Sequence, residues 1–172
     1  MIQIAKTIQF RIAILIVSMF LTTLQAPAME GEPEAQFVLE RLDKIYVGVD
    51  SDSINKLGLD GASVKSAIES KLSSSGMKIA SQSEYLNHPE INRLLITAKA
   101  MKHQGKWFYA LTLGLTEFVF LDENADRRVT VWAWRDEVVG FADKKEPKAT
   151  EKTVMERVDN FIDLWKRANG KK

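Results

Sequence analysis

Apolar and polar side chains alternate along several stretches of the chain, and a period of two is typical of β-strands. The first stretch is Ile45–Val49, where Tyr46 and Gly48 separate the aliphatic residues, and the turn-forming run Asp50–Ser53 predicts its end. Three longer strands are predicted further along the chain, at Arg93–Met101, Trp107–Leu121 and Arg127–Val139.

Short connections separate these three longer strands. Lys102–Lys106 contains Gly105, and Asp122–Asp126 is polar and rich in turn-forming side chains. Both are within the usual hairpin length of roughly two to five residues. The three strands are therefore predicted to form an antiparallel meander.

Helical periodicity occurs in two places. In the first, Val64, Ile68 and Leu72 follow Asp60, which can cap the first turn, and precede Gly76, which suits a left-handed helix end. The second helix follows the loop Phe141–Ala149 and ends at Asn169-Gly170. Its apolar stripe consists of Val154, Val158, Phe161, Ile162 and Trp165.

Met77–Ala80 predicts a short strand directly after the first helix. A strand, a helix and a strand in succession place the two strands parallel, with the helix crossing over one face. We therefore expect a single α+β domain over residues 37–172. It has a mixed five-stranded sheet (a βαβ unit followed by an antiparallel three-strand meander), a crossover helix and a C-terminal helix.

Residues 1–28 have the pattern of a signal peptide. Lys6 and Arg11 precede the apolar run Ile12–Leu24, and Ala26-Pro27-Ala28 supplies a small-x-small cleavage site. Cleavage after Ala28 predicts a periplasmic or secreted protein with no integral membrane span. The alternative is an uncleaved anchor, although the run is shorter than the roughly 20 apolar residues that span a bilayer.

Residues 29–36, with Gly31 and Pro33, predict a flexible leader after the cleavage site.

Composition narrows the classes of function that are expected. The absence of cysteine excludes thiol catalysis, cysteine-ligated zinc, disulfides and lipidation at the signal. The 24 Lys and Arg residues balance 23 Asp and Glu residues without a basic block, so nucleic acid is not an expected partner.

Candidate catalytic residues are few. His88 and His103 lie in predicted loops, and the His-Glu-x-x-His zinc pattern is absent. Asp122–Asp126 begins like a calcium loop, but Arg127 and Ala133 stand where that loop needs Gly and Glu. Because nucleophile elbows and phosphate-binding glycine patterns are also missing, we expect no catalytic residue, metal ligand or cofactor.

The last predicted hairpin has two apolar faces if its turn places Leu121 opposite Arg127. The aliphatic face, suited to burial under helices, contains Leu111, Leu113, Leu115, Val119, Leu121, Val129, Val131 and Ala133. The aromatic face contains Phe108, Thr112, Gly114, Thr116, Phe118, Phe120, Thr130, Trp132 and Trp134. In this register Trp134 lies across from Gly114 and Trp132 across from Thr116.

The aromatic face has two interpretations. Rigid rings with a polar edge are preferred anchors for protein partners, which makes Trp132, Trp134, Gly114, Phe118 and Thr116 candidate partner-binding residues. Alternatively, a large ring fills the space over a strand glycine and the last helix covers the face. A slip of one residue in register would exchange the two faces.

Four segments resemble a family of small exported bacterial proteins of unknown function: Lys44–Asp50, Leu57–Leu59, Ser74–Ile79 and Thr130–Trp134. The order of elements is also similar in outline to the amino-terminal α/β domain of the periplasmic protein TolB. The second resemblance implies a role in envelope assembly or protein contacts, and the first assigns no catalytic residue.

Three functions follow as hypotheses. The leading one is a non-catalytic periplasmic binding or envelope-assembly module, with a protein or cell-envelope component bound on the aromatic face or a sheet edge. A small-molecule carrier would hold its ligand between the sheet and the last helix, beside Trp165 and Phe161. A carboxylate enzyme would use Asp50 and Asp52 at the end of the first strand. The sequence pattern predicts no oligomeric state.

Overall fold

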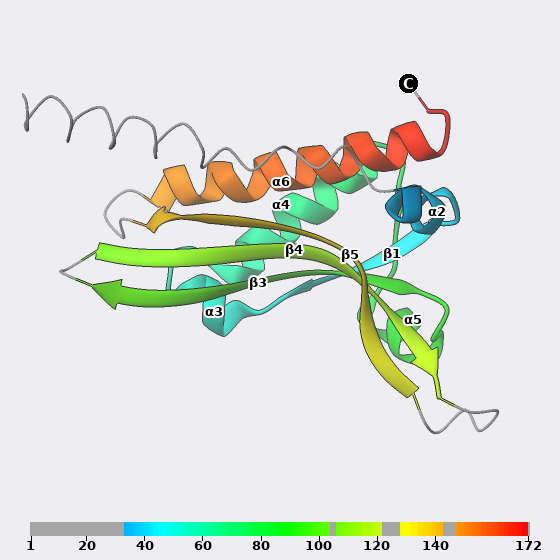
Figure 1. Ribbon diagram of the computed structural model, residues 1–172, viewed down its shortest axis with the longest axis horizontal. Helices are drawn as coiled ribbons and strands as arrows, with labels where there is room; N and C mark the ends of the chain where they lie inside the picture. Colours follow the sequence, from blue (N-terminus) through cyan, green and yellow to red (C-terminus); the bar gives the residue numbers. More distant parts are fainter. Residues whose placement is uncertain (1–32, 104–105, 122–127, 143–146, 172) are drawn as a thin grey trace, which may run out of the picture. The chain divides into compact units, whose positions relative to one another are not determined.

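Five strands form one mixed sheet in the order β2-β1-β3-β4-β5 (Figure 1). The computed structural model describes residues 33–103, 106–121, 128–142 and 147–171. The strands are β1 (Lys44–Val49), β2 (Lys78–Ile79), β3 (Asn92–His103), β4 (Lys106–Phe120) and β5 (Arg128–Ala142). β1 pairs parallel with β2 and β3, whereas β3, β4 and β5 pair antiparallel. The predicted α+β fold and its meander are confirmed.

The helices are α2 (Pro33–Glu40), α3 (Ser51–Asn55), α4 (Gly61–Ser74), α5 (Gln82–Asn87) and α6 (Pro147–Ala168). α4 and α6 are the two predicted helices, whereas α3 takes the place of the turn expected after β1. α2 begins at Pro33, inside the segment expected to be a flexible leader. None of the described helices is long and apolar enough to cross a membrane.

The ends of α4 follow from its sequence. The Asp60 side chain accepts a hydrogen bond from the Ser63 backbone N–H at 2.8 Å, which satisfies one of the free donors of the first turn. Gly76 has a φ of +91°, a backbone conformation that side chains with a Cβ rarely adopt. α4 leads into β2, so the predicted parallel βαβ unit is present.

The main hydrophobic core lies between one face of the sheet and the helices α4 and α6, which lie on the same side (Figure 1). Ile45 and Val47 of β1 are fully buried there, and α2 and α3 add Leu39 and Ile54. The α6 stripe is buried as predicted, at Val154, Val158, Phe161, Ile162 and Trp165.

The opposite face of the sheet is called the open face below. Of the described helices, α5 is the one that packs on it, at one end. Tyr85 of α5 stacks on Tyr46 of β1 with ring centroids 4.7 Å apart, and on Phe118 of β4 at 5.9 Å. These rings form a second, smaller core with Ala80 and Ile91.

A β-bulge changes the predicted register of the last hairpin. Thr116 pairs with Trp132 as predicted, but the register then shifts by one residue, so Trp134 pairs with Leu115 and Arg135 pairs with Gly114. The prediction that Trp134 lies across from Gly114 is therefore wrong. The extra residue, Ala133, moves Trp134 to the helix-covered face, because side chains alternate between faces along a strand.

The aliphatic face of the hairpin is buried over only part of its length. Leu111, Leu113 and Leu115 are buried as predicted, whereas the residues nearer the turn are exposed, at Val119, Leu121 and Val129. Figure 1 shows the corresponding ends of β4 and β5 curving away from α6. A bulge increases the local twist and bend of a strand, so this end of the hairpin extends beyond the helices.

Candidate binding face

The register assigns the open-face residues to rows across β3, β4 and β5, since directly paired residues point to the same side. The rows run from the α5 end to the opposite end as follows: Arg93-Thr116-Trp132, Leu95-Gly114-Arg135, Thr97-Thr112-Glu137, Lys99-Ala110-Val139 and Met101-Phe108-Phe141. Four of the five candidate residues lie on this face, namely Trp132, Gly114, Phe118 and Thr116.

Trp132 lies over Gly114. A Cβ added to Gly114 would overlap the Trp132 ring and come within 2.9 Å of the Trp134 backbone oxygen. Gly114 therefore leaves room on the sheet for a large ring, in the way that the sequence suggested for Trp134. The Trp132 side chain remains 43% exposed.

Trp134 lies on the other face, beneath α6. Its ring is partly buried against the core, and its centroid is 5.3 Å from that of Phe161. Of the two candidate tryptophans, Trp132 alone is thus available to a partner on the open face. Trp132 thus combines the exposure of the first interpretation with the packing over a glycine of the second, whereas α6 covers the opposite face, to which the bulge moves Trp134.

Thr116 and Phe118 have structural contacts on this face. Thr116 is buried, and its hydroxyl donates to the Arg93 backbone oxygen at 3.3 Å. Phe118 is partly buried between Tyr85 and the guanidinium of Arg128, which lies 4.5 Å from the Phe118 ring centroid. The α5 end of the open face is therefore aromatic and cationic.

The opposite end of the open face is apolar. Met101 and Phe141 are each 66% exposed and Val139 is 78% exposed. A shallow hollow of about 280 Å³ lies here, lined by Lys99, Ala100, Met101, Phe108, Tyr109, Ala110 and Val139. Exposed apolar side chains are thus found at both ends of the open face, since Phe120 and Trp132 are exposed near the first end.

Cations outnumber acids among the described strand residues of the open face. Arg93, Arg128 and Arg135 lie around Trp132, whereas the acid in the five rows is Glu137. Glu137 accepts a hydrogen bond from Thr112 at 3.2 Å and lies 3.9 Å from Arg135. The rim of the exposed ring is therefore suited to a partner that carries carboxylates.

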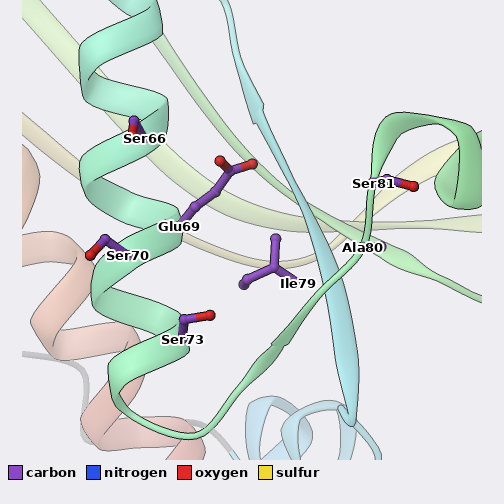
Figure 2. Close-up of a pocket in the computed structure, with 7 residues that line it drawn as sticks. All are labelled: Ser66, Glu69, Ser70, Ser73, Ile79, Ala80 and Ser81. Atoms are coloured by element: carbon purple, nitrogen blue, oxygen red, sulfur yellow. The ribbon is translucent and has the colours of Figure 1, made fainter.

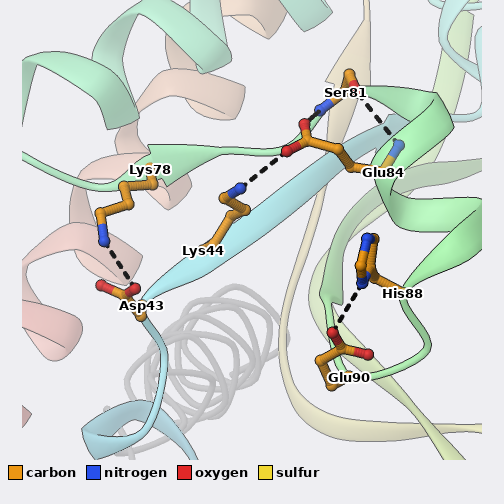
Figure 3. Close-up of polar contacts among 7 residues, drawn as sticks. All are labelled: Asp43, Lys44, Lys78, Ser81, Glu84, His88 and Glu90. Atoms are coloured by element: carbon orange, nitrogen blue, oxygen red, sulfur yellow. Dashed lines mark hydrogen bonds and ion pairs between the residues drawn. The ribbon is translucent and has the colours of Figure 1, made fainter.

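One ion pair attaches α5 to the sheet (Figure 3). Glu84 forms a capping box with Ser81 and accepts a hydrogen bond from the Lys44 side chain of β1 at 2.9 Å. The hydrogen bond from Lys44 is the largest effect that lowers the pKa of Glu84, which falls from 4.5 to about 2. Lys78 and Asp43 form a second exposed pair at 2.8 Å.

Asp50, a candidate in the enzyme hypothesis, has a structural role. Its carboxylate caps α3 by accepting from the Ser53 N–H, and it also accepts from the Thr97 hydroxyl at 3.1 Å. Burial raises the pKa of Asp50, but these hydrogen bonds outweigh it, so that the pKa lies below its usual value. Asp52 is exposed in the first turn of α3.

The two histidines are both exposed. His88 Nδ1 lies 3.0 Å from the Glu90 carboxylate (Figure 3), and His103 ends β3 with its ring centroid 6.2 Å from that of Phe108. In the part of the chain that the structure describes, no three His, Asp or Glu residues are grouped as metal ligands. The calcium-like segment 122–126 lies outside the described residues.

A polar groove of about 470 Å³ lies between α4 and the edge strand β2. It is lined by Ser66, Glu69, Ser70, Ser73, Ile79, Ala80 and Ser81, and Figure 2 shows Glu69 and Ser73 on the side of α4 that faces Ile79. Glu69 pairs with Lys65 of the same helix at 3.6 Å. The lining includes serines but no histidine, so it supplies no histidine base to activate a hydroxyl.

The side chains that a carrier would place around its ligand are packed. Phe161 is fully buried, and Trp165 is buried with its indole N–H donating to the Leu42 backbone oxygen at 2.9 Å.

Comparison with known proteins adds no functional information: no family model matches the chain, and a search of curated proteins finds no significant match.

Proposed function

We propose that this protein is an exported, non-catalytic binding module that docks a protein of the cell envelope on its open face. The observation that carries the proposal is the exposed Trp132 ring, which lies over Gly114 on a face that α4 and α6 leave uncovered. A rigid, half-exposed indole costs little conformational entropy on binding and is a common anchor at protein interfaces.

The surroundings of Trp132 indicate what the partner presents. Arg93, Arg128 and Arg135 favour carboxylates, and the exposed apolar side chains at both ends of the face favour aliphatic or aromatic groups. A central apolar anchor with a charged rim is the usual anatomy of a protein interface. The resemblance to exported proteins of unknown function and to the TolB domain agrees with such a role.

Quantitative pull-down from a periplasmic extract tests the proposal. Trp132→Ala is expected to reduce recovery of a specific partner at least tenfold, about 1.4 kcal/mol of binding free energy. Phe37→Ala is the matched control, because it removes a ring of α2 that is 57% exposed but not on the open face. An unchanged partner set for folded Trp132→Ala would refute the proposal.

The charge argument has its own test. Arg128→Glu is expected to slow association with that partner and to remove much of its salt dependence, since charges at an interface rim act mainly on the association rate. If binding were equally fast and equally salt-dependent in the variant, the carboxylate-bearing partner would be the wrong class.

Export is part of the proposal and rests on residues 1–28. Mass spectrometry of the protein recovered from the periplasm is expected to show a chain that begins at Met29. A chain that retains Met1 in the membrane fraction would instead support the anchor.

A further inference from the structure

β5 has a free edge. It is last in the strand order, and among the described strands β4 is the one that pairs with it. The outward N–H and C=O groups of such a strand are a template for another strand, and natural sheets protect long edges with proline or covering elements. β5 contains no proline, and it carries the highly exposed Val139 and Phe141.

Val138 is the central residue of the regular part of β5. Beyond the bulge, β5 pairs without interruption with β4 from Trp134 to Ala142, and Val138 is midway between these two residues. An antiparallel pairing of β5 with itself around a two-fold axis at Val138 would set Trp134 of each copy opposite Ala142 of the other. That register uses the whole regular segment and stops at the bulge.

Charge disfavours the registers whose axis lies before Val138. A two-fold axis at Arg135, Asp136 or Glu137 would place a charge directly opposite its own copy, which is destabilising. The axis at Val138 sets Glu137 opposite Val139 of the second copy and Arg135 opposite Phe141 of the second copy. The second pair brings a guanidinium next to an aromatic ring, a favourable arrangement. An axis at Val139 would instead place the Glu137 carboxylate opposite Phe141.

We propose that two copies of this chain pair antiparallel through β5, with the two-fold axis at Val138, so that their sheets become continuous. The pairing covers Val139 and gives the outward backbone groups of Trp134–Ala142 their partners. Because the contact is one strand wide, it belongs to the small and weak class of interfaces, with a dissociation constant on the order of micromolar.

The axis is perpendicular to the sheet, so both open faces lie on the same side of the dimer. Two Trp132 rings are then presented together, and a partner with two docking sites would bind more tightly than one copy allows. The dimer does not require the proposed function, because none of its contacts involves Trp132.

Cysteine crosslinking tests the position of the axis, and the chain has no native cysteine. Val138→Cys places two thiols on the axis, where strand pairing brings Cα atoms to about 4.5 to 5.5 Å, within disulfide range. Under mild oxidation it is expected to give a crosslinked dimer on a non-reducing gel. Val129→Cys is the matched control, on the same strand but before the bulge, and is expected to stay monomeric.

Charge substitutions at Val139 test the register. Because Val139 is highly exposed, a protein with either charge at this position is expected to fold. Analytical ultracentrifugation across micromolar concentrations is expected to show about tenfold weaker dimerisation for Val139→Glu, which faces Glu137 of the second copy. Val139→Lys is expected to dimerise as well as or better than the unchanged protein. An axis at Val139 would weaken both variants and overturn the register.

A protein that stays monomeric at all these concentrations, with Val138→Cys crosslinking no faster than Val129→Cys, overturns the proposal as a whole. Proper folding of each variant is checked by circular dichroism. Loss of partner binding in Trp132→Ala with the dimer intact would concern the open face and leave this proposal standing.

Discussion

At the residue scale, Gly114 and Trp132 depend on each other. The ring occupies the space that a Cβ of residue 114 would need, and the Trp134 backbone oxygen limits any retreat. Overpacking of this kind costs about 1 to 3 kcal/mol. Gly114→Ala is therefore expected to lower the free energy of unfolding in urea by about that amount and to increase the exposure of Trp132.

Gly48→Ala is the control for this substitution. A Cβ at Gly48 would meet the Arg93 side chain at 3.0 Å, and that flexible chain can move aside. Its loss of stability is expected to be clearly smaller. Equal losses for the two variants would contradict the close fit of Trp132 on Gly114.

Glu84 makes the attachment of α5 sensitive to acid. Its pKa of about 2 in the folded protein lies below the ordinary 4.5, so its contribution to stability is complete above pH 4.5 and is lost as the pH falls toward 2. Urea unfolding at a series of pH values is expected to show Glu84→Gln less stable than the unchanged protein at pH 7, with the difference closing between pH 4.5 and 2. A difference that does not change with pH would contradict the ion pair with Lys44.

At the element scale, the bulge in β5 decides the roles of two neighbouring tryptophans. Trp134 packs on Phe161 under α6, whereas Trp132 lies half-exposed on the open face. Trp134→Ala is expected to cost about 2 to 4 kcal/mol of unfolding free energy and Trp132→Ala clearly less, because the cost grows with the packed area lost. Urea unfolding measures both variants. Equal costs would indicate the register without a bulge, in which both rings lie on the same face.

The long elements were predictable, as was the short strand β2 after α4, whereas the short helices α3 and α5 were not. The α6 stripe and the three long strands repeat their pattern over many residues, whereas α3 and α5 contain barely more than a turn each. Short helices are unstable alone and form here because Ile54 is buried in the main core and Tyr85 stacks on Tyr46. A signal for α5 was present in the capping box of Ser81 and Glu84.

At the scale of the whole described unit, side chains near the end of α6 hydrogen-bond to the backbone near the end of α2. Trp165 donates to the Leu42 oxygen and Asn169 donates to the Leu39 oxygen, each at 2.9 Å. Trp165→Phe removes one donor and leaves a carbonyl unpaired next to the core, at an expected cost of about 1 to 3 kcal/mol.

Urea unfolding measures that loss, and hydrogen exchange is expected to show faster exchange around Leu39 and Leu42. Asn169→Ala is the control, because it removes the neighbouring hydrogen bond to the Leu39 oxygen at a less buried position. A Trp165→Phe variant as stable as the unchanged protein would mean that the hydrogen bond contributes nothing.

The sequence by itself determined the order of the long elements, the mixed sheet, the parallel first unit and the buried stripe of α6. These depend on local periodicity and on the geometry of short connections, which a linear pattern contains. Of the candidate face, it identified the aromatic residues and the glycine among them.

Only the tertiary structure decided which tryptophan is exposed, where α5 packs and which face the helices leave open. A single extra residue in a strand reverses every side chain beyond it, and no local preference marks Ala133 as that residue. The choice is made by packing: the bulge lets Trp134 reach Phe161 while Trp132 stays over Gly114.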